Sequence, residues 1–538
     1  MARALDHLQQ LKNNLWLITH QPINLPDYLS TYSSINLSNN QFRNCPQELR
    51  NSSQEIKNHS QELRDYSQEF ASLAQSYYQE LIPYIEQNIT PKVLINEPDT
   101  IHFLAKFLAI TAADLPIFLG NPQWQIQEWQ QVEKLIQPNL IWQSSSIENL
   151  DYPVIENHPS HIMIPTGGTS GTVKFAMHTW QTLAASVAGL QTYFERSVIN
   201  SFCVLPVYHV SGLMQFMRSL LTGGKLVITT TKYLENNLNS PLDISINTEI
   251  FPEIFPEIFP KISTEINPQE FFLSLVPTQL QKLLANPQTS SWLTKFSAIF
   301  LGGGAAWQEL LTQARALQIP LALTYGMTET ASQIATLKPQ DFLGENSTIH
   351  NTCGQVLPHA QLSLSDLGVI IIKSTSLALG YYPELWENNT FITDDLGDLD
   401  IFNKTGYLSI AGRQSLQIIT GGEKVFPPEV EAAILATKLV QDVCVLGMPD
   451  KYWGEVVAVV YVPVNSDTNL DQNSLDQNLE NILLEDISKV VQNSIAPHLA
   501  KYKIPKLWFS RAKLPRNAQG KINYQILRNE LKNVRKLS

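Results

Sequence analysis

The chain has 538 residues, 43% of them hydrophobic, and a formal net charge of −12. It is long enough to bury large cores in several domains, and its acidic balance argues against a general nucleic-acid-binding protein. The four cysteines are too far apart in sequence to predict a metal site or a disulfide framework.

The sequence predicts a cytoplasmic protein. The N-terminal stretch MARALDHLQQLKNNLW lacks the apolar core of a signal peptide. No stretch approaches the roughly 20 apolar residues that a membrane span needs. Scattered cysteines are typical of a reducing compartment.

Three repetitive segments interrupt the chain, at about residues 45–70, 240–266 and 466–482. In the first, a Gln-Glu-apolar unit recurs every seven residues, but one apolar position per heptad is fewer than a coiled coil needs, so a polar helix or a loose surface segment is expected. The second contains IFPEIFPEIFPKI, in which the prolines exclude a helix and a central strand. All three are predicted to be low-complexity insertions in loops.

Between these insertions, short apolar runs predict buried strands. In chain order they are HIMIP (161–165), SFCVLPV (201–207), KLVITTT (225–231), FFLSLVP (271–277), SAIFLGGG (297–304), PLALTYG (320–326) and GVIIIKS (368–374). Amphipathic stretches such as 307–318 separate several of them, and this alternation predicts a layered α/β fold. A smaller unit follows GYLSIAGRQ, with strands at 442–450 and 455–464 and a helix at 427–436.

The stretch IPTGGTSGTVK (164–174) predicts a phosphate-binding loop. Its glycines let successive N–H groups converge on an anion, and its hydroxyls and lysine add donors and charge. The expected ligands are Thr166, Gly167, Gly168, Thr169, Ser170, Gly171 and Lys174. The loop follows a predicted strand, where α/β sheets bind ligands, but it matches neither a Walker loop nor a nucleophile elbow. Taken alone, it is also compatible with a surface loop that binds nothing.

Four further motifs follow in order: YGMTETAS (325–332), GDLDIFNKTGYLSIAGR (397–413), GEKVFPPEVE (422–431) and PRNAQGKINYQIL (515–527). Together with the glycine loop, they resemble the adenylate-forming superfamily of acyl-CoA synthetases, luciferases and peptide-synthetase adenylation domains. The resemblance implies a large α/β domain of layered sheets and helices (1–412), a hinge (413–416) and a small mobile α+β domain (417–538).

Enzymes of this kind join a carboxylate to AMP, expel pyrophosphate and then transfer the acyl group to a thiol. The resemblance implies ATP and CoA as co-substrates and Mg²⁺ as the metal ion. Glu329 would hold Mg²⁺, Thr328 would contact the α-phosphate, and Tyr325 would stack on adenine, with Gly326 and Met327 beside it. In the glycine loop, Gly167 and Val173 depart from the usual Ser and Pro, and we expect phosphate binding to be retained.

The remaining nucleotide contacts are also implied by the resemblance. Gly302, Gly303 and Gly304 would line the adenine and acyl pocket. Asp398 would accept hydrogen bonds from the ribose hydroxyls, and Arg413 would reach the ribose or a phosphate at the domain junction. Ser415 replaces the usual hinge Asp or Lys, which leaves the electrostatics of the hinge open.

Two sites on the small domain complete the expected machinery. Lys521 would bridge the attacking carboxylate and the α-phosphate in the first step. The small domain would then rotate, carrying Lys521 away and bringing Gly421 and Gly422 to the pantetheine tunnel.

The acid substrate is predicted from the segment LPVYHVSGLMQFMRSLL (205–221). His209 would lie near the reacting carboxylate, and Ser211, Arg218 and Gly303 would complete the acyl site. With LGGGAA and YGMTETASQ, this segment most resembles the o-succinylbenzoate–CoA ligases of menaquinone and phylloquinone biosynthesis. Arg218 would then pair with the second carboxylate of the acid, although a helix arginine that reaches the surface or pairs with an internal acid stays an alternative.

Other functions remain open from the sequence. The chain could activate a benzoate, a coumarate or a fatty acid, or pass its acyl group to a carrier protein instead of CoA. A non-catalytic nucleotide-binding protein is a further alternative. The expected partners are small molecules, with no nucleic acid and no membrane span, and a homodimer is compatible with the sequence.

Overall fold

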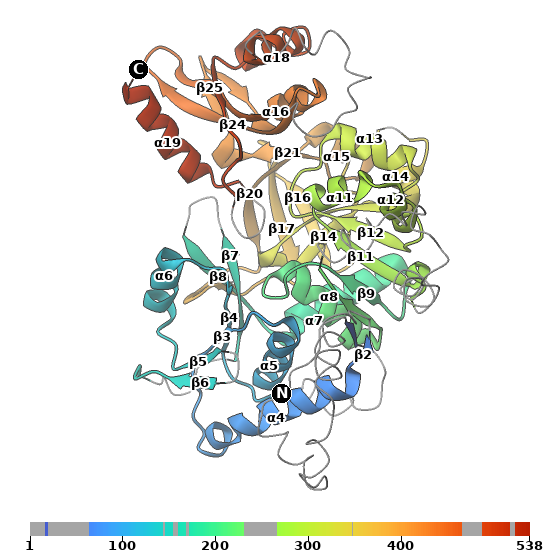
Figure 1. Ribbon diagram of the computed structural model, residues 1–538, viewed down its shortest axis with the longest axis vertical. Coiled ribbons are helices and arrows are strands. Elements are labelled where there is room, and N and C mark those ends of the chain that lie inside the picture. Colours follow the sequence, from blue (N-terminus) through green and yellow to red (C-terminus); the bar gives the residue numbers. More distant parts are fainter. Residues whose placement is uncertain are drawn as a thin grey trace, which may run out of the picture.

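The computed structural model describes residues 17–19, 64–143, 146–153, 160–167, 172–230, 266–346, 348–464, 487–516 and 522–537. Figure 1 shows a small C-terminal unit, coloured orange and red, above a larger body. The insertion at 466–482 and nearly all of that at 240–266 lie outside the described residues, whereas the end of the first insertion forms the start of helix α4, where Phe70 is buried. No helix of these described residues is long and apolar enough to cross a membrane.

In the described part of the chain, the first sheet has eight strands in the order β19-β18-β8-β7-β4-β3-β5-β6. They are β3 (Val93–Asn96), β4 (Ile117–Leu119), β5 (Leu140–Gln143), β6 (Ser146–Asn149), β7 (Ile162–Gly167), β8 (Val173–His178), β18 (Gly380–Tyr381) and β19 (Glu384–Leu385). Its helices are α4 (Ser67–Glu86), α5 (Thr100–Ala112) and α6 (Ile126–Ile136). The parallel strands β3 and β4 are apolar because both of their faces are covered.

The second sheet has nine described strands in the order β15-β14-β13-β12-β11-β9-β10-β1-β2. They are β1 (Leu17–Thr19), β2 (Arg64–Asp65), β9 (Asn200–Cys203), β10 (Leu226–Ile228), β11 (Phe271–Leu275), β12 (Ala298–Leu301), β13 (Leu321–Met327), β14 (Ser332–Thr336) and β15 (Gln355–Val356). The helices of this region are α7 (Trp180–Phe194), α8 (Val210–Thr222), α11 (Pro277–Leu284), α12 (Pro287–Leu293), α13 (Gln308–Ala316) and α14 (Pro339–Leu343).

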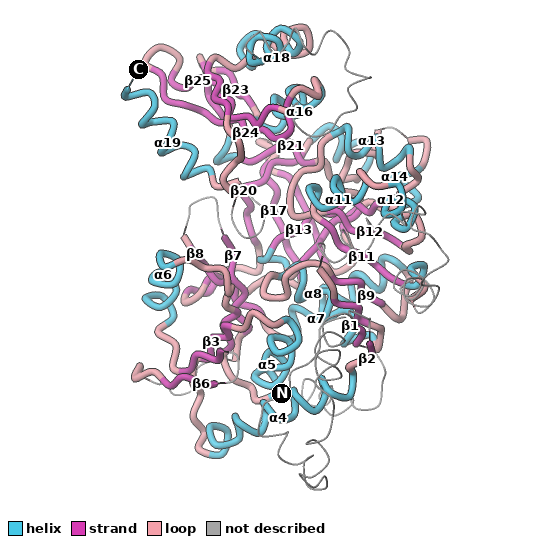
Figure 2. Tube along the Cα trace, in the orientation of Figure 1, coloured by secondary structure: helices cyan, strands magenta, loops and turns pink. Residues whose placement is uncertain are grey.

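Two smaller sheets follow. One is antiparallel and pairs β16 (Ala360–Leu364), β17 (Val369–Ser374), β20 (Phe391–Gly397) and β21 (Ile410–Arg413), with α15 (Leu399–Thr405) between the last two. The other contains β22 (Ile418–Thr420), β23 (Glu423–Val425), β24 (Val440–Asp450), β25 (Gly454–Pro463) and β26 (Leu507–Ser510). Helices α16 (Pro427–Ala436), α18 (Ile487–Ile495) and α19 (Tyr524–Leu537) accompany this last sheet (Figure 2).

The predicted α/β architecture is confirmed, and each apolar run named above contains an observed strand. The runs are short and mostly buried, which is the signal that separates interior strands from surface segments. The predicted helix at 307–318 is α13, and that at 427–436 is α16.

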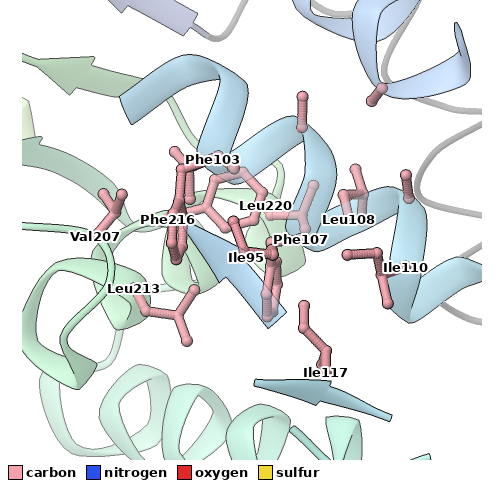
Figure 3. Packing of buried hydrophobic residues seen from close by; sticks show 14 of the residues in the cluster. Ile95, Phe103, Phe107, Leu108, Ile110, Ile117, Val207, Leu213, Phe216 and Leu220 are labelled. Carbon is pink, nitrogen blue, oxygen red and sulfur yellow. The ribbon is translucent and has the colours of Figure 1, made fainter. Parts of the chain in front are cut away.

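The largest core joins the first two sheets through the helices between them. Figure 3 shows Phe103 and Phe107 of α5 packed with Phe216 and Leu220 of α8. The rings of Phe107 and Phe216 meet edge to face, with centroids 6.2 Å apart. This packing holds α7 and α8 against strand β14, which carries residues of the candidate site.

Candidate active site

The glycine loop joins two antiparallel strands of the first sheet. Thr166 near the end of β7 is paired with Lys174 on β8, and residues 168–171 at the tip lie outside the described residues. The Lys174 ammonium lies over the ring of Tyr381, 5.1 Å from its centroid. The lysine of the predicted phosphate loop is therefore held by a residue that comes more than 200 positions later in the chain.

The same tyrosine reaches the predicted metal ligand. The Tyr381 hydroxyl donates to Glu329 Oε1 at 2.5 Å, and Glu329 is 7% exposed. Burial and the neighbouring Glu329 carboxylate raise the pKa of Tyr381, so its hydroxyl keeps the proton that it donates. The structure thus brings Lys174, Tyr381 and Glu329 together at one place.

Glu329 lies in η3 (Thr328–Thr330), the turn between β13 and β14. Gly326 is required just before this turn, because a Cβ at that position would lie 2.2 Å from the carbonyl oxygen of Ser332. The backbone of the two strands can approach only without a side chain there. Met327 and Thr328 follow directly, so the residues predicted to contact the nucleotide lie beside the predicted metal ligand.

Mg²⁺ fits this part of the site. Among the described residues, no cluster of three or more His, Cys, Asp or Glu is placed to hold a metal ion. A single carboxylate beside a phosphate-binding loop nevertheless suits Mg²⁺, which takes one or two carboxylates and completes its shell with phosphate oxygens and water. The hard oxygen of Glu329 meets that requirement.

A second carboxylate, Asp395 on β20, lies between two predicted nucleotide residues. Its Oδ2 accepts from the Tyr325 hydroxyl at 2.8 Å, and its Oδ1 accepts from Arg413 Nε at 3.0 Å. The Asp395 side chain is 12% exposed and that of Arg413 is 42% exposed, so the pair has one side toward solvent.

The predicted ribose ligand Asp398 has a different place. It is the N-cap of α15, where its Oδ1 accepts from the backbone N–H of Ile401 at 3.0 Å. A capping aspartate satisfies a helix terminus, and within the described residues Asp398 makes no hydrogen bond to Tyr325 or Arg413. The contacts of Asp395 make it a second candidate for the ribose ligand, and the assignment of that role to Asp398 stays a prediction.

Asparagine substitutions at these two positions are expected to have opposite outcomes. Asp395→Asn should weaken ATP binding by about 10- to 100-fold, because a hydrogen bond to a charged group contributes roughly 1.5–3 kcal/mol. Asp398→Asn should leave ATP affinity within about threefold, because asparagine caps a helix as well as aspartate does. Calorimetric titration with ATP measures both, and weakened binding only in the Asp398 variant would assign the ribose to Asp398 instead of Asp395.

Helix α8 carries the predicted acyl-site residues. His209 is its N-cap and is buried, and Ser211 is exposed in the first turn. Arg218 lies two turns further along and is buried. Its Nη2 donates to Ser332 Oγ at 2.9 Å and to Gln333 Oε1 at 2.6 Å, and its guanidinium carbon lies 5.4 Å from the centroid of the Phe300 ring. Arg218 thus reaches neither the surface nor an acid among the described residues.

Gly302, Gly303 and Gly304 follow directly after β12, whose Phe300 packs on Arg218. The structure therefore places this glycine segment at the end of a strand that borders both β13 and the Arg218 contact. Its role in the adenine and acyl pocket stays a prediction.

The predicted hinge has a polar contact in place of the usual charge. The backbone N–H of Ser415 donates to Asp394 Oδ1 at 2.9 Å, and its hydroxyl donates to Asp394 Oδ2. Asp394 lies on β20 next to Asp395. Ser415 therefore retains an electrostatic partner, although the hinge function of 413–416 and the domain limits stay predictions.

The predicted CoA-binding glycines form the turn between β22 and β23. Gly421 and Gly422 have φ angles of +60° and +87°, which favour glycine, and the Gly421 N–H donates to the Trp453 carbonyl at 2.9 Å. The ring of Trp453 lies beneath this turn, and the Lys506 ammonium lies 3.7 Å from the ring centroid. An exposed turn without side chains fits the approach of a narrow ligand.

Lys521 lies outside the described residues, but its flanks are described. Arg516 and Ile522 form an antiparallel bridge, and the Asn523 N–H donates to the Pro515 carbonyl at 2.8 Å. Arg516 Nη2 also bonds both carboxylate oxygens of Asp442, at 2.7 and 2.8 Å. The residues that flank Lys521 in sequence are therefore paired with one another, and Arg516 connects them to β24 through Asp442.

A buried carboxyl near this base predicts a pH-dependent stability. Burial raises the pKa of Glu431 on α16 to about 7 from its ordinary value of 4.5, although the hydrogen bond that its carboxylate accepts from the Val445 N–H opposes the shift. Because the folded pKa lies above the unfolded one, the stabilisation is full below about pH 4.5 and is lost as the pH rises through about 7.

Glu431→Gln is therefore expected to gain stability relative to the parent protein by about 1–3 kcal/mol between pH 5 and pH 8. Urea unfolding at both pH values measures the difference. Glu429→Gln on the same helix is the matched control, since Glu429 forms an exposed ion pair with Lys503. A stability difference between the Glu431 variant and the parent that stays constant with pH would contradict the prediction.

Comparison with known proteins now adds to this geometry. Residues 76–238 and 256–382 match the family model of the AMP-binding enzyme, and residues 429–521 match that of the AMP-binding enzyme C-terminal domain. The chain belongs to the AMP-binding enzyme family. A curated relative from Listeria monocytogenes, named 2-succinylbenzoate–CoA ligase, is 31% identical over 374 residues, which are 68% of each chain. One of the same name from Enterococcus faecalis is 28% identical over 429 residues, covering 76% of this chain and 78% of its own.

Solved structures show the same fold. An o-succinylbenzoate CoA synthetase from Bacillus subtilis, in complex with its acyl-adenylate intermediate, has a TM-score of 0.67 and 21% identity, covering 88% of this chain and 94% of its own. The same enzyme with ATP and magnesium ion has a TM-score of 0.65 and 21% identity, covering 88% of this chain and 95% of its own. The adenylate-forming fold predicted from the motifs is thus confirmed, and the AMP-binding enzyme is an ATP-dependent acyl-CoA ligase that works through an acyl adenylate.

Several residues that the structure places at the candidate site were not singled out from the sequence. Asp395 is one of them, although an aspartate directly before the strand-like run LG in TDDLG is a polar residue that could have pointed to it. Tyr381 had no local signal, since its two contacts come from distant segments. His178, at the end of β8, was missed for the same reason.

Proposed function

We propose that this enzyme is a 2-succinylbenzoate–CoA ligase, which forms 2-succinylbenzoyl-CoA and releases AMP and pyrophosphate. The observation that carries the proposal is the buried guanidinium of Arg218. Burial lowers its pKa to about 10, which leaves it charged at neutral pH. A buried charge without an ionic partner is costly, so an anionic substrate group is the expected partner.

The surroundings of Arg218 support an oxygen-rich ligand. Arg218 Nε and Gln333 Nε2 are both buried donors that find no hydrogen-bond partner among the described residues. Gln333 Oε1 accepts from Arg218 Nη2 and from the Ser332 hydroxyl, the latter at 2.7 Å. These two bonds orient the side-chain amide, so that its nitrogen is left as a donor. Two unused donors beside a cation suit a carboxylate that is not itself activated. The names of the curated relatives agree with such an acid.

The proposed first step joins the other carboxylate of the acid to the α-phosphorus of ATP. The hairpin from Thr166 to Lys174 would hold the β- and γ-phosphates, and Thr328 would contact the α-phosphate. Glu329 would hold Mg²⁺, which offsets negative charge on the phosphates when bound. Lys521 would bridge the two reacting anions, since an attack between like charges needs a positioned cation. Tyr325 and Asp395 would hold adenosine.

In the proposed second step, the thiol of CoA attacks the acyl adenylate and AMP leaves. The turn at Gly421 and Gly422 would admit pantetheine after the small domain has rotated. His209 would lie beside the reacting carboxylate. We also propose a cytoplasmic location and a role in menaquinone or phylloquinone synthesis, since these rest on the same substrate.

The test is pyrophosphate release with ATP, Mg²⁺ and a panel of acids, each with and without CoA. The panel contains 2-succinylbenzoate, benzoate, coumarate and octanoate. The proposal expects a strong preference for 2-succinylbenzoate and a CoA thioester as product. Near-full activity on a monocarboxylic acid would overturn the substrate, and acyl transfer only to a carrier protein would overturn CoA as the acceptor.

A further inference from the structure

The turn between β13 and β14 has a backbone that needs external support. Ala331 and Ser332 have φ angles of +51° and +97°, a region that residues with a Cβ adopt only at a cost. Such a conformation costs about 1–3 kcal/mol per residue, so it persists only where the surrounding structure stabilises it. The turn carries Thr328 and Glu329 at one end and Ser332 and Gln333, which contact Arg218, at the other.

The support comes from donors outside the turn. Its four successive carbonyls at 328–331 each accept a hydrogen bond from another segment. The donors are His178 Nε2 to Thr328 at 2.8 Å, the Ala378 N–H to Glu329 at 2.8 Å, the Ser376 hydroxyl to Thr330 at 2.9 Å and the Ser186 hydroxyl to Ala331 at 2.7 Å. The turn is therefore fixed from β8, from α7 and from the segment before β18.

Among these donors, His178 is the one whose protonation state can be assigned. The residue is fully buried, and burial lowers the pKa of its imidazole to about 4, so the ring is neutral at physiological pH. A carbonyl can only accept, so Nε2 carries the proton and Nδ1 faces the Thr182 hydroxyl of α7, 3.0 Å away, as an acceptor. The Thr328 carbonyl thus selects the tautomer, since the Thr182 hydroxyl is compatible with either one.

His178 also occupies a distinctive place in the fold. It ends β8, the strand that begins next to the glycine loop with Val173 and Lys174. A strand is a stiff element, so the hydrogen bond at its far end fixes the hairpin of the glycine loop relative to the turn that carries Thr328. The two segments are 150 positions apart in the chain.

We infer that His178 is a positioning residue for adenylate formation, which aligns the glycine-loop hairpin with the turn at Thr328 and Glu329. It does so through its Nε2 hydrogen bond to the Thr328 carbonyl, and Ser186 supports the same turn from α7. The inference rests on the roles proposed above for the hairpin, Thr328 and Glu329.

The test compares His178→Leu, which removes the donor, with His178→Gln, whose Nε2 lies the same number of bonds from the backbone. His178→Leu is expected to lower kcat for pyrophosphate release by about 10- to 100-fold, since a misplacement of about 1 Å costs up to 100-fold. KM for ATP should change by less than about threefold, because the groups that bind ATP remain. His178→Gln should recover kcat to within about fivefold of the parent enzyme.

The matched control is His350→Leu, which removes a histidine whose Nε2 lies 2.5 Å from the Gly344 carbonyl, outside the turn. It should leave kcat unchanged. Loss of kcat to the same extent in His178→Gln and His178→Leu would overturn the inference, as would equal losses in kcat and in ATP affinity.

Two further measurements keep the test decisive. If His178→Leu does not fold, Ser186→Ala removes a second donor to the same turn and should lower kcat by about 3- to 10-fold with KM for ATP retained. Hydrogen exchange without substrates should be faster at the amides of 329–333 in His178→Leu and Ser186→Ala than in the control. Unchanged exchange rates at these amides in both variants would overturn the inference. This measurement needs no acid substrate, so it stays decisive if the enzyme activates no acid of the panel, a result that would separately overturn the proposed function.

Discussion

Arg218→Ala is expected to lower kcat/KM for 2-succinylbenzoate by about 30-fold or more, mainly through KM for the acid. Truncating one partner of a buried, hydrogen-bonded charge pair costs about 2–5 kcal/mol, which corresponds to factors from about 30 to several thousand. Steady-state kinetics of thioester formation, with the acid varied at saturating ATP and CoA, measures the effect. ATP affinity should be retained, since the Arg218 contacts within the described residues are with Ser332, Gln333 and the Phe300 ring rather than with the predicted nucleotide ligands.

Arg218→Lys is the matched variant, because it keeps the charge and loses the planar fork of donors. It should lie between the parent enzyme and the alanine variant. Both variants remove the hydrogen bonds from Arg218 to Ser332 and Gln333. The temperature of thermal unfolding, compared with that of the parent enzyme, checks that this loss does not destabilise the turn. An unchanged KM for 2-succinylbenzoate in Arg218→Ala would show that the guanidinium has a purely structural role.

Lys521→Ala is expected to slow acyl-adenylate formation by about 100- to 1,000-fold, the usual effect of removing one preorganised electrostatic group. Conversion of a synthetic acyl adenylate to the CoA thioester should change by no more than about threefold, because the proposed domain rotation carries Lys521 away before that step. Single-turnover assays of the two half-reactions measure the two rates separately.

Lys513→Ala is its control, since Lys513 is exposed in the same C-terminal segment. It removes an equal charge and should leave both half-reactions unchanged. Equal losses in the two half-reactions of Lys521→Ala would contradict the assignment of this lysine to the first step alone.

Much of the fold could be predicted from local pattern. The buried strands β11, β12 and β13 are continuous apolar runs, and such runs identify interior strands because both faces of a parallel sheet are covered. The motifs around Glu329 and the glycine loop could be found because phosphate and metal chemistry needs particular residues at close spacing.

The choice between Asp395 and Asp398 shows where local pattern is insufficient. The two residues are three positions apart, and both are aspartates, a residue type that suits the ribose hydroxyls. Only the fold separates them, since one lies within strand β20 between Tyr325 and Arg413 and the other caps α15. A strand side chain points to one face of its sheet, where it can meet other segments, whereas the side chain of a capping residue bonds its own helix.

The sequence by itself determined the family, the α/β class and the segments that carry the chemistry, because each of these depends on residues close together in the chain. Tertiary structure decided which side chains meet. Arg218 reaches Gln333 over 115 positions, and His178 reaches Thr328 over 150. Arg218 reaches Gln333 because α8 packs against β14, and His178 reaches Thr328 because β8 lies against η3. Packing of that kind is set by the summed burial of many apolar side chains, so no short stretch of sequence encodes the partner of any one polar group.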